Sequence, residues 1–86
     1  ARRADQAAAR ARLARLSRRE QEVLARLVTG VRNKQIAAAL GIGERTVKLH
    51  RSAITAKLQV RSLAELLDLV RIAGTLPAGD GTFPKG

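Results

Sequence analysis

Residues 33–58 read NKQIAAALGIGERTVKLHRSAITAKL, and this segment decides the fold that we expect. Its first part predicts a short helix over 34–40, with Asn33 as the candidate N-cap. Glycines bound the turn at 41–43: the first can take the left-handed conformation that ends a helix, and the second is an acceptable N-cap. A longer helix is expected over 44–58. Two helices joined in this way form a helix-turn-helix.

The longer helix has two contrasting faces when its residues are projected at about 100° per residue. Val47, Ile54 and Leu58 fall together and form the stripe expected in the core. The opposite face holds donors, small residues and one leucine, namely Arg45, Lys48, Leu49, Ser52 and Ala56. Donors read guanine edges, and an apolar group contacts the thymine methyl in the major groove. We therefore favour a base-reading face over an ordinary solvated face with a stray leucine.

The formal net charge is +10, and basic side chains concentrate around the expected helix-turn-helix. Residues 42–62 carry five basic and one acidic side chains, whereas residues 63–74 carry one basic and two acidic side chains. Such a basic domain attracts a polyanion. We favour double-stranded DNA over an anionic membrane, because no helix combines a basic face with bulky apolar anchors.

Size and missing residue types narrow the function classes. A chain of 86 residues makes one small domain, and without cysteine it has neither a disulfide framework nor a thiolate zinc site. His50 is the only histidine and has no obvious carboxylate partner, so we expect no enzyme, no cofactor and no metal site. No apolar run approaches the roughly 18–20 residues of a membrane span, and we expect a cytoplasmic protein.

Three segments are expected along the chain. Residues 1–16 are rich in Ala and Arg and predict either a helical linker from an absent N-terminal domain, which we favour, or a disordered basic arm. Residues 17–74 form the DNA-binding domain. Residues 75–86, with both prolines and Phe83, predict a disordered tail.

Capping signals mark the two remaining helices of an all-α, four-helix domain. Ser17 and Glu20 have the spacing of a capping box and open a first core helix that ends at Gly30. Ser62 and Glu65 repeat that spacing before a fourth helix over 63–73.

The fourth helix carries more apolar residues than one buried face needs. Leu63, Leu67 and Val70 form one stripe, which we expect on the core. A second stripe beside it contains Leu66, Leu69, Ile72 and Ala73. We favour a second copy of the chain as the partner of this second stripe, with dimer contacts at Leu66, Leu69 and Ile72. The alternative is that the N-terminal helix covers the stripe within one chain.

Residues 16–66 closely resemble the C-terminal DNA-binding domain of LuxR-type transcription regulators, including the NarL/FixJ branch of response regulators. The matching string is LSRREQEVLARLVTGVRNKQIAAALGIGERTVKLHRSAITAKLQVRSLAEL. It contains the three hallmarks of that family at the expected spacing: Leu-Ser-x-x-Glu at 16–20, Asn-Lys-x-Ile-Ala at 33–37 and Thr-Val-Lys-x-His at 46–50.

This resemblance implies a bacterial transcription regulator, the output domain of a two-component response regulator, whose third core helix enters the major groove. It implies base contacts at Lys48, Leu49 and Ser52, to which the helical projection adds Arg45. It implies phosphate contacts at Asn33, Lys34, Thr46, Arg51 and Lys57. It further implies a homodimer through the fourth helix, and we expect RNA polymerase as a partner.

Two departures from the family pattern weaken single contacts. Gly43 stands where the family often has Ser or Thr, which makes the cap weaker by a few tenths of a kcal/mol. Ser52 stands where many relatives carry a longer donor. Region four of sigma factors, a promoter-binding module, is the nearest alternative, but it lacks the capped, leucine-rich fourth helix over 63–73.

Overall fold

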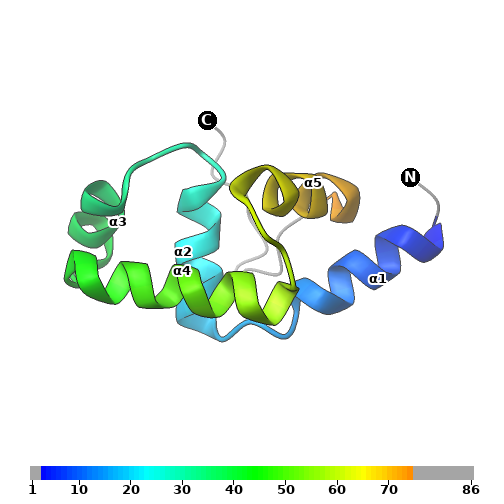
Figure 1. Cartoon of the computed structure of the whole chain (residues 1–86), viewed down its shortest axis with the longest axis horizontal. Helices are drawn as coiled ribbons and strands as arrows, with labels where there is room; N and C mark the ends of the chain where they lie inside the picture. The colour runs from blue at the N-terminus through cyan, green and yellow to red at the C-terminus, as the bar shows by residue number, and fades with distance from the viewer. Residues whose placement is uncertain (1–2, 75–86) are drawn as a thin grey trace.

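The computed structural model describes residues 3–74, which fold into helices without any strand. The helices are α1 (Arg3–Leu13), α2 (Arg18–Leu27), α3 (Asn33–Leu40), α4 (Glu44–Leu58) and α5 (Leu63–Ala73) (Figure 1). The expected all-α class is confirmed, and α3 and α4 are the two helices of the helix-turn-helix. Expectations for residues 75–86, Phe83 among them, lie outside the described residues.

Side-chain caps hold the starts of α2 and α5. The Ser17 hydroxyl accepts the Glu20 N–H at 3.1 Å while the Glu20 carboxylate accepts the Ser17 N–H at 2.8 Å, which confirms the capping box. At α5 only half of a box forms. The Ser62 hydroxyl accepts the Glu65 N–H at 3.2 Å, but the Glu65 carboxylate accepts from the Arg61 N–H instead.

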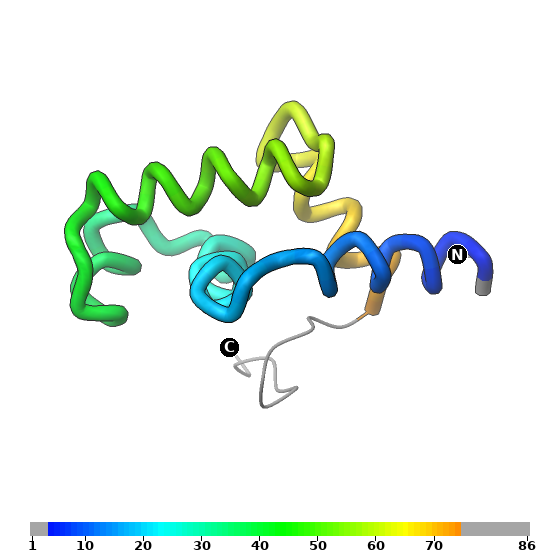
Figure 2. Tube along the Cα trace, turned by 90° about the horizontal axis from the view of Figure 1, so that it is seen from below, coloured from blue at the N-terminus to red at the C-terminus, as the bar shows by residue number. Residues whose placement is uncertain are grey.

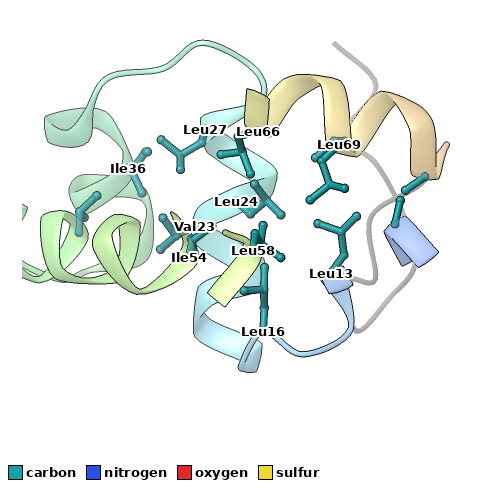
Figure 3. Packing of buried hydrophobic residues seen from close by; sticks show 14 of the residues in the cluster. Leu13, Leu16, Val23, Leu24, Leu27, Ile36, Ile54, Leu58, Leu66 and Leu69 are labelled. Atoms are coloured by element: carbon teal, nitrogen blue, oxygen red, sulfur yellow. The ribbon is translucent and has the colours of Figure 1, made fainter. Parts of the chain in front are cut away.

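One hydrophobic core joins the helices (Figure 3). Val23 and Leu24 of α2 are fully buried at its centre, where Ile54 and Leu58 of α4 pack on them. Ile36 of α3 is also fully buried and closes the core at the end next to α3. Replacing a fully buried Leu or Ile by Ala costs about 2–5 kcal/mol of stability, so each of these side chains contributes strongly to holding the helices together.

Helix α1 lies alongside α5 at the end of the molecule away from α3 (Figures 1 and 2). Its apolar residues Ala9 and Leu13 are buried, and Leu13 points toward Leu69 of α5 (Figure 3). The Arg10 Nε donates to the Ala73 carbonyl at 2.8 Å, which satisfies a free carbonyl at the end of α5. Residues 3–13 are therefore part of the folded domain, whatever precedes them.

The burial of α5 follows the two expected stripes only in part: Val70 of the first stripe is 7% exposed, as expected for the core, but Leu63 and Leu67 of the same stripe are not buried. Leu66 and Leu69 are 2% and 6% exposed, so they belong to the core of this chain, whereas Leu63 and Leu67 are 46% and 40% exposed. Ile72 is exposed at the margin. The expectation that Leu66 and Leu69 lie open for a second copy is corrected, because both are buried within this chain. Leu69 faces Leu13 of α1, which is the alternative of cover by the N-terminal helix, whereas Leu66 lies beside Leu24 and Leu27 of α2 (Figure 3).

Candidate nucleic-acid interface

The turn between α3 and α4 is set by one glycine. Gly41 has φ +68° and ψ +34°, the left-handed conformation expected of it. This conformation lets the Ile42 N–H donate to the Ala37 carbonyl at 3.0 Å, which closes the end of α3. Ala37 is itself buried and belongs to the hydrophobic core. The turn is thus held by the backbone and fixes the direction in which α4 leaves.

Helix α4 presents the expected faces. Val47, Ile54 and Leu58 are fully buried, which confirms the predicted stripe. Helices α2 and α3 both pack against α4 from that side. The residues expected to contact bases all lie in the exposed class on the other side: Arg45, Lys48, Leu49 and Ser52. Leu49 is 64% exposed, the largest exposure among the big apolar side chains of the described residues.

Candidate phosphate contacts lie at the starts of α3 and α4. Lys34 and Thr46 are exposed in the first turns of these helices. Helix N-termini carry free N–H groups and a partial positive charge, so an anion is favoured beside both residues.

Asn33 is the first helical residue of α3 rather than its N-cap, which corrects the expectation from sequence. The N-cap is Arg32, whose N–H donates to the Gln35 side chain at 2.9 Å. The Asn33 side chain is instead used in a tertiary contact, because its Oδ1 accepts from the Arg51 Nη1 at 2.8 Å. Arg51 lines a shallow surface groove together with Lys48, Ser52 and Thr55.

Lys57, also expected at phosphate, forms an ion pair inside the chain. Its Nζ lies 2.7 Å from a Glu20 carboxylate oxygen, and Glu20 is only 6% exposed. Burial by itself raises the pKa of Glu20, but hydrogen bonds from Lys57 and the Ser17 backbone, with the Lys57 charge, outweigh it and lower that pKa. The carboxylate therefore stays ionised and ties α4 to the capped start of α2.

Sequence reasoning missed both tertiary pairs, Asn33–Arg51 and Glu20–Lys57. Their members lie 18 and 37 residues apart, so no helical spacing rule connects them. For Lys57 the sequence held a partial indication of a contact within the chain, because the helical projection places this residue beside the buried stripe of α4.

Other kinds of site are not built by residues 3–74. No group of three or more His, Cys, Asp or Glu side chains among them is arranged to hold a metal ion. Within the same residues, no helix has the length and apolar character that crossing a membrane requires. His50 is half-buried on α4.

A family model described as bacterial regulatory proteins, luxR family, matches residues 14–70. The chain is 46% identical over 71 residues to the transcriptional regulatory protein FixJ of Azorhizobium caulinodans, covering 83% of this chain and 34% of that protein. It is 44% identical over 69 residues to FixJ of Rhizobium meliloti, again covering 34% of the relative. The chain thus spans about a third of the length of these relatives.

Two solved structures share the fold. The response regulator StyR matches with a TM-score of 0.75 and 49% identity, over 80% of this chain and 35% of that one. Full-length FixJ from B. japonicum matches with a TM-score of 0.78 and 39% identity, over 83% of this chain and 35% of that one. The family match includes most of α5, the element by which we separated this family from sigma-factor region four. The chain therefore belongs to the LuxR family of bacterial regulatory proteins and contains the family's helix-turn-helix DNA-binding domain.

Proposed function

We propose that the chain is the sequence-specific output domain of a two-component response regulator, with α4 in the major groove of its operator. The observation that carries this proposal is the free face of α4, where three donor side chains surround the exposed Leu49. The relatives support the wider role, because StyR is named a response regulator and the FixJ proteins are named transcriptional regulatory proteins.

Base reading is assigned to the side chains that α4 presents to solvent. Lys48 and Arg45 are long donors suited to guanine O6 and N7, and Leu49 suits the thymine methyl group. Ser52 is short, so its contact with a base is expected to pass through water.

Phosphate binding positions the domain without reading sequence. Lys34 and Thr46 lie at helix starts, and Arg51 lies on the flank of α4. The resemblance to the family also implies phosphate contacts at Asn33 and Lys57, although the Asn33 side chain bonds Arg51 and the Lys57 side chain bonds Glu20.

Assembly on DNA is proposed to use the exposed side of α5. Leu63 and Leu67, with Ile72 at the margin, replace Leu66 and Leu69 as the apolar residues open to a second copy. An N-terminal signal-receiving domain, contact with RNA polymerase and a place in the cytoplasm, where operators lie, complete the proposed role.

The proposal is tested by fluorescence anisotropy with a labelled duplex over a series of salt concentrations. The slope of log K against log salt is expected to be clearly negative, with about −0.9 for each phosphate neutralised. A slope of zero contradicts DNA binding.

Substitutions of two lysines distinguish a contact with a base from a contact with a phosphate. Lys48→Ala is expected to cost about 1–3 kcal/mol at one operator position and to flatten base preference there. Lys34→Ala should weaken all duplexes alike. The comparison uses sites selected from a random pool by each variant, and unchanged preference in Lys48→Ala assigns Lys48 to phosphate instead.

A further inference from the structure

Arg51 is held by a neutral partner. Its Nη1 donates to the Asn33 Oδ1 at 2.8 Å, and both side chains are half-buried. Other basic side chains in the fold are held by carboxylates: Arg19 by Glu22, Arg71 by Asp68 and Lys57 by Glu20. A carboxylate cancels the charge of its partner, whereas an amide oxygen orients the guanidinium and leaves its charge uncompensated.

The position of Arg51 decides what that charge can reach. It lies on the flank of α4 between the base-reading face and the buried stripe, on the side where Asn33 begins α3. A side chain on this flank meets the wall of a DNA groove, where phosphates lie, rather than its floor.

The shallow groove on the protein surface beside Arg51 offers few other hydrogen-bond donors. It is lined by Lys48, Ser52 and Thr55. The Thr55 hydroxyl donates to the Ser52 carbonyl at 2.9 Å, so its hydrogen is engaged inside the helix. Arg51 and Lys48 are the two positively charged side chains that line this groove on the protein surface. A guanidinium has five N–H donors, of which the Asn33 bond uses one.

We propose that Asn33 is a positioning residue, which holds the Arg51 guanidinium in place for the backbone phosphate that the proposed function assigns to Arg51. This inference rests on the proposed DNA binding and changes the role of Asn33 from direct ligand to support. Because Asn33 orders the Arg51 side chain during folding, less rotamer entropy is lost when the phosphate binds. The remaining donors of the planar fork then face the anion already oriented.

The test is a double-mutant cycle of Asn33→Ala, Arg51→Ala and the double variant, measured by anisotropy on a fluorescent duplex of random sequence. Arg51→Ala is expected to weaken binding about tenfold and to reduce the salt slope by about 0.9. Asn33→Ala should weaken binding several-fold in the wild-type chain and cause no further loss when Arg51 is already Ala.

Two further variants act as controls. Arg71→Ala removes the same charge from α5 and is expected to change affinity much less than Arg51→Ala does. Asn33→Asp keeps a hydrogen-bond acceptor but compensates the Arg51 charge, so it should bind more weakly than Asn33→Ala. Thermal unfolding of each variant confirms that the chain is folded during the measurement.

Three outcomes overturn the inference. An equal loss from Asn33→Ala in both backgrounds means that Asn33 contacts DNA itself. An unchanged salt slope in Arg51→Ala means that Arg51 holds no phosphate, and wild-type affinity in Asn33→Asp means that the pair is irrelevant to binding. In all three cases the wild-type chain still binds the duplex with an affinity that depends on salt. If the proposed function itself is wrong, the wild-type chain binds no duplex at all.

Discussion

Gly43 caps the recognition helix with no side chain. Its φ of −77° and ψ of 156° are open to any L-residue, and a Cβ there meets nothing within 4 Å. A serine hydroxyl at this position is placed to accept a free N–H of the first turn of α4. The N-terminus of α4 thus lacks a side-chain cap, which a single substitution at Gly43 can supply.

Gly43→Ser is expected to raise the free energy of unfolding by about 0.5–1 kcal/mol, through the added cap and the stiffer unfolded chain. Thermal unfolding followed by circular dichroism should show a rise of a few degrees. Gly41→Ser is the matched control, because φ +68° strains any L side chain and a loss of about 1 kcal/mol is expected there. A lower melting temperature for Gly43→Ser contradicts the capping argument.

Glu20 combines a capping acceptor with a nearly buried ion pair. Its pKa is lowered in the folded chain, so the unfolded chain binds its proton more readily. The stability it adds is present above the unfolded pKa near 4.5 and is lost as pH falls through the lower folded pKa. This carboxylate therefore contributes to acid unfolding.

Glu20→Gln keeps an oxygen for the Ser17 N–H but removes the charge facing Lys57. At neutral pH we expect a loss of about 1–2 kcal/mol, below the usual figure for a buried pair because the Lys57 side chain is 42% exposed. The difference from wild type should shrink as pH falls below about 4.5. Urea unfolding at several pH values measures it, and Glu22→Gln, from the exposed pair with Arg19, should change little.

At the scale of the element, the packing of a neighbouring helix decides which side of α5 is buried. Leu69 is 6% exposed beneath α1, whereas Leu67 on the same helix is 40% exposed. A charge at the first position is buried without a partner, and a charge at the second stays in water.

Leu69→Asp is therefore expected to cost several kcal/mol and largely unfold the domain. Leu67→Asp is expected to keep the stability within about 1 kcal/mol of wild type. Circular dichroism in increasing urea distinguishes them. Equal tolerance of both substitutions means that α1 does not cover α5 in solution.

At the scale of the whole molecule, the proposed reading by one α4 would cover only a few base pairs, and the proposed second copy would double it. Two copies related by a two-fold axis would place their recognition helices about one DNA turn, roughly 34 Å, apart. Leu63 and Leu67, with Ile72 at the margin, are the large apolar residues of α5 that are exposed and open to the proposed contact.

Leu67→Asp is expected to abolish cooperative binding to a duplex with two inverted half-sites while leaving affinity for one half-site intact. Gel-shift titrations with one-site and two-site duplexes measure the difference. The Arg71→Ala variant tests whether any change on the surface of α5 has this effect. Full cooperativity in Leu67→Asp places the dimer contact elsewhere.

Short-range patterns in the sequence were sufficient to predict several local features of this fold. The end of α3, the bounds of α4, the left-handed Gly41 and the Ser17–Glu20 box follow from interactions within about one helical turn, whereas the start of α3 lies one residue before the expected one. The outward face of α4 follows from the same periodicity. Val47, Ile54 and Leu58 lie on one side of the helix and are buried in the core, so the opposite side must face solvent.

Tertiary structure alone decided which apolar residues of α5 are buried and how the long side chains pair. Both stripes of α5 are apolar enough for a core, and the packing of the other helices decided between their residues: Leu69 is buried facing Leu13 of α1, and Leu66 is buried beside Leu24 and Leu27 of α2 (Figure 3). The Asn33–Arg51 and Glu20–Lys57 contacts join residues 18 and 37 positions apart. Such contacts depend on how helices cross, and packing of the whole core sets those crossings, which no local pattern encodes.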